Sequence, residues 1–275
     1  MRWMYWLAVP LVVLVGAPLL IVVPMSFSTS ASLIFPPPGY GLQHYAAYFS
    51  DYAWLLPTAN SLLIGVATAL LTLLLVVPAT FALVRYPFRG RALGRALVIL
   101  PLIVPNIVMA LGYYLYLGSL KLTQTYLGVI LAHACLCVPI AYLILEANLK
   151  NFDVNLERAA RSLGAAPMKT FWLVTFPILR PGFLAAGLFA FAHSFDEAVV
   201  ALFISGRDVP TLPRKMFESL RMESDPVMSV VSALLLAAVL LFTILYAVSK
   251  HYRSVRLRQR ATTPSGTANI SNSYS

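Results

Sequence analysis

Long runs of apolar residues, separated by short polar segments, dominate the chain. Each run is close to the roughly 20 residues that an α-helix needs to cross the hydrocarbon core of a bilayer. The runs are continuous and do not alternate with polar residues, as the strands of a transmembrane β-barrel would. We therefore predict an all-α, polytopic membrane helix bundle with six transmembrane helices, at about residues 3–25, 61–84, 97–117, 126–145, 182–205 and 227–248.

The composition agrees with this pattern. Of the 275 residues, 60% are hydrophobic and 11% are charged, whereas a soluble domain is about half apolar and about a quarter charged. The net charge of +10 does not indicate nucleic acid, because the basic residues lie between the apolar runs and in the tail. We expect membrane lipid around the protein and no nucleic acid.

The first apolar run has some features of a secretory signal peptide, since Arg2 precedes it and the segment STSAS follows it. The run is about twice as long as the apolar region of a usual signal peptide. We therefore interpret it as a membrane anchor.

Prolines and cysteines also lie within the predicted spans. Cys135 and Cys137 are two residues apart, so on a helix they point to different faces, and we interpret them as buried thiols without a disulfide or a metal. The prolines predict kinks in membrane helices; they are Pro78, Pro101, Pro105 and Pro139.

The positions of Lys and Arg predict the orientation. With six spans, most of the 20 basic residues fall on the side that carries both termini. Positive residues accumulate on the cytoplasmic side of membrane proteins, so both termini are predicted to be cytoplasmic. The end of the chain, from Ala261, is rich in Ser, Thr and Asn, which is typical of disorder.

One inner loop carries the pattern of two short helices, in the segment NFDVNLERAARSLGAAPMKTFWLVTFPILRPG. Asp153 is suited to cap a helix, Gly164 to end it and Pro167 to begin a second helix, which then meets Pro177. Such a bent knob, with small residues at its elbow, suits docking into a groove of another protein. An amphipathic segment on the membrane surface is the alternative.

Two adjacent acids interrupt the fifth apolar run, in FAHSFDEAVVALF. An acid within a membrane helix costs about 2.5–3.5 kcal/mol to insert and is expected to face protein or water, not lipid. His193 precedes Asp196 by three residues and Glu197 by four, so it could reach either acid. Either these acids are structural, or they line a translocation path and attract a cation. The candidate path residues are Asp196, Glu197 and His193.

The segment LERAARSLGAAPMKTFWLVTFPILRPG resembles the EAA loop of type I ABC importer permeases. In that family the loop forms a coupling helix that binds the ATPase subunit. One position departs from the pattern, because Arg158 stands where a glutamate usually precedes the two alanines, and Glu157 lies one residue earlier. The resemblance implies a coupling role for Glu157, Ala159, Ala160, Gly164, Ala165 and Pro177.

Three further segments resemble the spermidine/putrescine branch of this family: TANSLLIG at 58–65, SFDEAVVALFISG at 194–206 and TLPRKMFESLRMESDPVMSVVSALLL at 211–236. We therefore expect a first transmembrane helix and outer loop at 1–57, a permease core at 58–250 with its coupling loop at about 150–181, and a basic, disordered tail at 251–275.

The resemblance implies a multi-pass permease subunit in the bacterial inner membrane. Its expected partners are ATP-binding cassette ATPase subunits, a second homologous permease and a periplasmic or extracellular solute-binding protein. The most favoured solute is a polyamine; other small solutes stay open, as does a stand-alone secondary carrier. The sequence lacks a phosphate-binding GxxxxGK[ST] loop, so ATP hydrolysis is expected on a partner, and we expect no enzyme activity and no cofactor in this chain.

Overall fold

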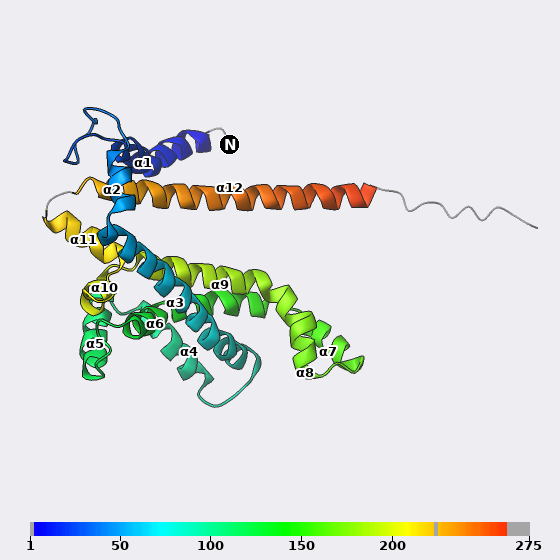
Figure 1. Cartoon of the computed structure of the whole chain (residues 1–275). Helices are drawn as coiled ribbons and strands as arrows, with labels where there is room; N and C mark the ends of the chain where they lie inside the picture. The colour runs from blue at the N-terminus through cyan, green and yellow to red at the C-terminus, as the bar shows by residue number, and fades with distance from the viewer. Residues whose placement is uncertain (1–2, 223–224, 263–275) are drawn as a thin grey trace, which may run out of the picture. The chain divides into compact units, whose positions relative to one another are not determined.

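The computed structural model describes residues 3–222 and 225–262. Its contacts divide the chain into two compact units, residues 1–48 with 224–275, and residues 49–223. Figure 1 shows the helices in chain order. They are α1 (Trp3–Ser26), α2 (Gln43–Ser50), α3 (Tyr52–Arg85), α4 (Arg91–Ile99), η1 (Leu100–Leu102), α5 (Asn106–Ser119), α6 (Tyr126–Lys150), α7 (Val154–Ser162), α8 (Pro167–Thr170), η2 (Phe171–Thr175), α9 (Phe176–Asp196), α10 (Val199–Ile204), α11 (Leu212–Met222) and α12 (Val227–Thr262).

The first unit pairs the first and last helices of the chain, because α1 packs against α12. Polar contacts join its parts near the end of α1. The Ser26 hydroxyl lies 2.8 Å from the Tyr45 hydroxyl, and the Ser229 hydroxyl donates to the Met25 carbonyl at 3.3 Å. Residues far apart in the sequence therefore form this unit.

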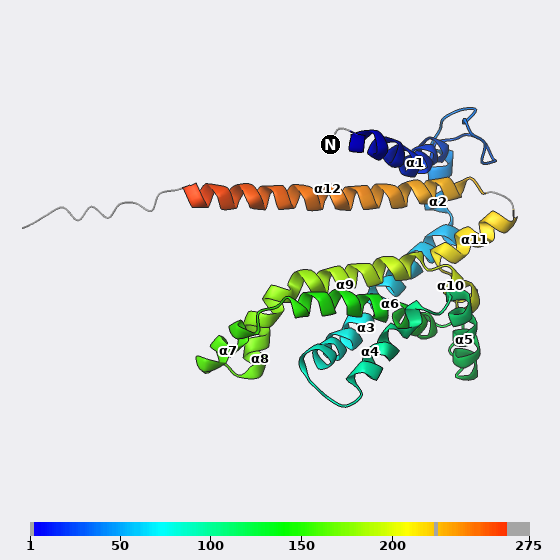
Figure 2. The same cartoon turned by 180° about the vertical axis from the view of Figure 1, so that it is seen from behind.

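The core of the second unit is a bundle of α3, α6 and α9, which lie side by side in both views (Figures 1 and 2). The buried face of α3 repeats every three or four residues and is rich in small side chains, which let neighbouring membrane helices approach closely. A Cβ added to Gly65 would lie 3.0 Å from the Phe191 ring. The opposite face exposes large apolar side chains that suit lipid: Leu62, Leu63, Leu70 and Leu74.

Four helical spans in the described ranges are long and apolar enough to cross a membrane: Tyr52–Arg85, Tyr126–Lys150, Pro167–Asp196 and Val227–Val248. A fifth is counted if the bent pair of helices at Arg91–Ser119 forms one span. The first predicted span, at 3–25, is helix α1. The all-α membrane bundle is confirmed, whereas the number of six spans stays a prediction.

The third predicted span, at 97–117, is not one continuous helix, and it bends at Pro101 and Pro105, two of the prolines predicted to cause kinks. The chain bends by 103° between Arg91–Leu102 and Asn106–Ser119. Pro101 lies in the short helix η1 and Pro105 is the N-cap residue of α5. Because proline lacks an N–H donor and its ring clashes with the preceding turn, two prolines four residues apart break the helix. Pro78 and Pro139 lie inside the continuous helices α3 and α6.

The fifth predicted span, at 182–205, was wrong at both ends. Helix α9 ends at Asp196, and a separate helix, α10, follows at Val199–Ile204. On the other side, α8, η2 and α9 run on without a gap, so the second helix of the predicted knob continues into the membrane span. Pro177 lies inside this continuous segment, two residues after the π-helical stretch η2 ends.

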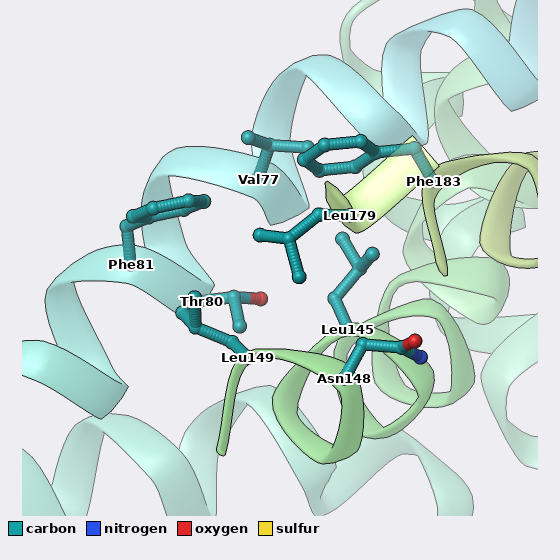
Figure 3. Close-up of a pocket in the computed structure, with 8 residues that line it drawn as sticks. All are labelled: Val77, Thr80, Phe81, Leu145, Asn148, Leu149, Leu179 and Phe183. Atoms are coloured by element: carbon teal, nitrogen blue, oxygen red, sulfur yellow. The ribbon is translucent and has the colours of Figure 1, made fainter. Parts of the chain in front are cut away.

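A small cavity lies where α3, α6 and α9 meet (Figure 3). Its volume is about 10 Å³, which leaves room for one water molecule at most. The Thr80 hydroxyl is buried here without a hydrogen-bond partner among the described residues. The cavity is far too small for a transported solute, so it is a packing defect within one chain.

The thiols and the tail also differ from expectation. Cys137 is buried, as predicted, but Cys135 is exposed, and both are free thiols. Helix α12 continues to Thr262, so the first part of the predicted disordered tail at 251–275 is helical. Residues 263–275 lie outside the described ranges. The predicted boundaries at 57 and 250 stay predictions, because the two compact units follow contacts and not those divisions.

Candidate functional site

The inner loop forms the expected bent knob from α7, a tight turn and α8. The Asp153 carboxylate caps α7 by accepting a hydrogen bond from the Asn155 N–H at 2.9 Å. At the other end Gly164 has φ +86°, a left-handed conformation that glycine adopts without steric cost. The Gly164 N–H donates to Arg161 O at 2.9 Å and the Ala165 N–H to Ala160 O at 3.1 Å, which is the hydrogen-bond pattern of a Schellman motif.

The predicted coupling residues lie on both sides of this turn. Ala159 and Gly164 are exposed, whereas Ala160, Ala165 and Pro177 are half-buried. The tip of the knob exposes large apolar side chains, with Leu163 90% and Met168 68% exposed. Isolated apolar residues are common on surfaces, but neighbouring ones of this size favour a binding partner or a membrane.

Glu157 differs from the other coupling candidates, because it faces the interior and is only 6% exposed. Its Oε2 atom accepts a hydrogen bond from Arg85 Nη1 at 2.5 Å. Its Oε1 atom accepts a short hydrogen bond from the Thr175 hydroxyl. Arg85 ends α3 and Thr175 ends η2, so Glu157 joins the knob to two elements of the membrane bundle. We call Glu157, Arg85 and Thr175 the latch.

Aromatic rings enclose the arginine of the latch. The Arg85 guanidinium lies 5.0 Å from the centre of the Phe81 ring and 5.2 Å from that of Phe152, distances typical of cation–π contacts. The Nε and Nη2 atoms of Arg85 are buried without a hydrogen-bond partner among the described residues. Glu157 is therefore the main polar partner that compensates for the burial of this charge.

The latch carboxylate is ionised at neutral pH. Burial alone would raise the pKa of Glu157, but hydrogen bonds from Arg85 and Thr175, together with the Arg85 charge, hold this pKa below its usual value. A carboxyl whose pKa is lowered by folding stabilises the protein above its unfolded pKa, and this contribution is lost as the pH falls through the folded pKa. The latch is therefore fully formed at physiological pH.

A helix break separates the two acids of the candidate path. Asp196 is the last residue of α9 and is exposed, whereas Glu197 is buried with extended backbone (φ −73°, ψ 104°). The Glu197 Oε1 atom accepts a hydrogen bond from the Val200 N–H at 3.0 Å, at the start of α10. The expectation that both acids lie within one continuous helix was wrong; Glu197 stabilises the start of α10, and Asp196 is open to its surroundings.

His193 does not pair with either acid in the part of the chain that the structure describes. Its ring stacks on Phe189, with centroids 5.8 Å apart. The buried histidine nearby is His133 of α6, whose Nδ1 atom lies 2.9 Å from the Ser194 hydroxyl. Sequence reasoning missed this contact, although a histidine within an apolar span is itself a signal.

The partners of Glu157 were missed as well. Arg85 was only one of the basic residues on the predicted cytoplasmic side, and Thr175 had no predicted role. The two residues are 90 positions apart, so spacing alone gives no sign that they meet. Glu146, near the end of α6, likewise binds Arg95 at 3.1 Å and Lys150 at 2.9 Å; of these, the spacing of four residues to Lys150 was visible in the sequence.

Known proteins resemble the chain over most of its length. Residues 76–258 match the family described as binding-protein-dependent transport system inner membrane component. The putrescine transport system permease protein PotI of Escherichia coli (strain K12) is 31% identical over 230 residues, covering 81% of this chain and 82% of PotI. The spermidine/putrescine transport system permease protein PotC of the same strain is 26% identical over 206 residues, covering 75% of this chain and 78% of PotC.

The fold also matches a solved structure. This is the crystal structure of a bacterial ABC transporter involved in the import of the acidic polysaccharide alginate, with a TM-score of 0.69 over 91% of this chain and 95% of the other. The sequence identity is 18%, so this match shows the fold alone. The family match and the two relatives show that the chain is a multi-pass permease subunit and not an enzyme. It belongs to the inner membrane components of binding-protein-dependent transport systems, in the spermidine/putrescine branch of the type I ABC importers.

Proposed function

We propose that this permease subunit imports a polyamine, as part of an assembly with a second permease, two ATPase subunits and a solute-binding protein. The observation that best supports this proposal is that the buried latch holds the exposed knob to the membrane bundle. In the proposed assembly, ATP is bound and hydrolysed by a partner subunit and not by this chain. The permease therefore needs a site that receives movement from that partner. The knob has the exposure and the anchoring that such a site requires.

The knob is proposed to dock on the ATPase through its tip. Leu163 and Met168 are exposed there, beside the small residues Gly164 and Ala165, which allow a partner backbone to come close. The alternative, an amphipathic helix lying on the membrane, is less favoured, because α7 has only 9 residues and turns sharply into α8. A bent pair of short helices suits a groove better than a flat lipid surface.

The latch is proposed to pass the movement on. Glu157 moves with α7, and its two oxygen atoms hold Arg85 of α3 and Thr175 of η2. Thr175 lies in a stretch with π-helical hydrogen bonding, a conformation that is frequent at functional sites. A displacement of the knob is therefore transmitted to two bundle helices at once, which is what a switch between inward-open and outward-open states requires.

A polyamine is the proposed solute because the two relatives transport putrescine or spermidine and putrescine by name. Asp196 offers an exposed carboxylate at a helix break, and a polycation is attracted by such a charge. Both termini and the knob are proposed to be cytoplasmic, since the six-span arrangement would put most basic residues on that side. His193 is proposed to lie beside the translocation path, with no direct role in attracting the solute.

Reconstitution tests this proposal. The permease would be purified in a complex with its second permease and its ATPase subunits, placed in liposomes, and supplied with the solute-binding protein and labelled spermidine or putrescine. We expect uptake that requires ATP inside the liposomes. ATP-dependent uptake of a different solute, with none of either polyamine, would overturn the solute; uptake by this chain alone without ATP would indicate a secondary carrier.

A further inference from the structure

A cleft of about 490 Å³ lies in the second unit, at the N-terminal end of α3. It is formed by the start of α3, the loop after α10 and one side of α11. Its walls carry three basic side chains and one acidic one, beside Tyr52 and Pro57. The charged residues are Arg207, Arg214, Lys215 and Glu218. None of these contributes to the knob or to the latch.

The structure holds the cleft in shape with buried hydrogen bonds. The Asn60 amide donates to Pro210 O at 2.9 Å and accepts from the Tyr126 hydroxyl at 2.8 Å. The Ser61 hydroxyl accepts from the Leu212 N–H at 2.8 Å. These contacts join α3 to the segment that leads into α11. The cleft is therefore preformed and does not depend on a flexible loop.

Gly206 lines one wall of the cleft, where there is no room for a side chain. A Cβ added there would lie 2.1 Å from the Gln124 side-chain oxygen, so a larger residue would displace that side chain. The backbone N–H of Gln124 donates to Ile204 O at 2.8 Å. The turn before α6 thus supports the wall from behind.

The positive charges of the cleft are only partly compensated. Arg214 Nε donates to Glu218 Oε1 at 2.7 Å. The Lys215 ammonium lies 5.3 Å from the centre of the Trp54 ring and forms no ion pair with a described residue. Arg207 is exposed and likewise has no ion pair in the described ranges; Asp208 follows it but is not among the lining residues. Two cations are therefore available to a ligand.

The cleft and the latch are at opposite ends of one helix. Tyr52 begins α3 and Arg85 ends it, with 34 residues in the helix. At 1.5 Å per residue this is about 51 Å, longer than the roughly 30 Å hydrocarbon core. If the knob binds the ATPase, the cleft opens on the other side of the membrane, where solute is delivered.

We propose that this cleft binds acidic side chains of the solute-binding protein; this rests on the proposed function. Carboxylates suit a preformed site with two unpaired cations. The solute itself does not, because a polycation is repelled by Arg207 and Lys215. The solute-binding protein docks from the side of the membrane on which the cleft opens, so we assign these carboxylates to its docking surface. Charge complementarity of this kind sets the rate and the salt dependence of docking.

The test uses the complete transporter in lipid nanodiscs and the spermidine-loaded solute-binding protein. The measured quantity is the concentration of binding protein that gives half-maximal ATPase stimulation. We expect Lys215→Glu to raise this concentration roughly tenfold or more and wild type to weaken as salt is increased from about 50 to about 300 mM, because screening shortens the range of charge interactions. Lys215→Arg should stay close to wild type.

The matched control is Arg221→Glu. Arg221 lies on the same helix, with its guanidinium 4.7 Å from the Phe217 ring, and does not line the cleft. This variant has the same change of charge and should leave the half-maximal concentration unchanged. Equal amounts of copurified ATPase in all variants exclude misfolding as the cause.

Three results would overturn the docking site: no effect of Lys215→Glu, an equal effect of Arg221→Glu, or an altered KM for the solute at saturating binding protein. The last result would indicate direct contact with an anionic solute. A failure of the proposed function can be distinguished from a failure of the docking site. If the loaded solute is wrong, wild type shows no polyamine uptake, yet charge-dependent docking of the unloaded binding protein is still measurable by its binding to the nanodiscs.

Discussion

At the residue scale, the ion pair between Glu157 and Arg85 is the contact with the most direct consequence. Breaking one side of a buried pair leaves the other charge uncompensated, which costs about 3–5 kcal/mol in full burial. Arg85 keeps 19% of its side chain exposed, so a smaller loss is expected. We predict that Glu157→Gln destabilises the permease by about 1–3 kcal/mol.

A double-mutant cycle with Arg85→Met measures this coupling through thermal unfolding in detergent. The double variant should lose less than the sum of the single variants, because it leaves no unpaired charge. Arg158→Gln is the control, since Arg158 is exposed on the same helix. Additive losses would contradict the latch. In reconstituted transporters, Glu157→Gln should also lower uptake per ATP hydrolysed, whereas Arg158→Gln should not.

Asp196 is the residue whose charge is proposed to act in transport. Asp196→Asn keeps the size of the side chain and removes its charge, and a lost attraction of about 1.4 kcal/mol corresponds to a tenfold change in an equilibrium constant. We predict that spermidine or putrescine uptake falls severalfold at unchanged protein level. Uptake of labelled polyamine in cells with equal amounts of each variant measures this. Wild-type uptake would mean that Asp196 is structural.

Glu197 serves as the comparison for Asp196. Its carboxylate accepts from the Val200 N–H, a bond that the carbonyl oxygen of glutamine can retain. Glu197→Gln should therefore be milder than Asp196→Asn in uptake. Glu197→Ala removes the acceptor and should destabilise by about 1 kcal/mol, seen as a lower melting temperature.

At the element scale, the turn between α7 and α8 depends on Gly164. Its left-handed backbone costs other residues about 1 kcal/mol or more, and an acid there would add charge to the proposed docking face. We predict that Gly164→Asp leaves membrane insertion intact but separates transport from ATP hydrolysis. Copurification of the ATPase and solute-stimulated hydrolysis are the measurements.

The chain offers a matched control for this change. Gly90, in the connection from α3 to α4, also has positive φ, at +90°, and a Cβ there meets nothing within 4 Å. Gly90→Asp carries the same strain and charge at another loop, so it should keep the ATPase bound. Normal copurification and stimulated hydrolysis with Gly164→Asp would remove the docking role of the knob.

At the scale of the whole molecule, the prediction concerns topology. Single cysteines at Gly39 and Ser254 would be labelled with a membrane-impermeant reagent in cells, in a variant that lacks Cys135 and Cys137. With six spans and both termini inside, Gly39 should be labelled from outside and Ser254 only after the membrane is opened. Labelling of both from the same side would contradict the six-span arrangement.

Local chemistry explains why much of the knob was predictable. Asp153 caps α7, Gly164 ends it and Pro167 begins α8, and each of these depends only on neighbouring backbone. The end of α9 was not predictable in this way. The run from Phe191 to Phe203 reads as one apolar stretch with two acids, and the break becomes visible only when Glu197 is seen to bond the Val200 N–H.

The sequence by itself determined the membrane bundle, the approximate spans, the knob and the family, because hydropathy, capping residues and motifs act over a few neighbouring positions. Tertiary structure alone decided that Glu157 faces inward to Arg85 and Thr175, that the third span bends by as much as 103°, and that four charged residues meet in one cleft. Those features depend on which helices pack together. Contacts between residues distant in the chain are set by three-dimensional packing, which a single sequence does not display.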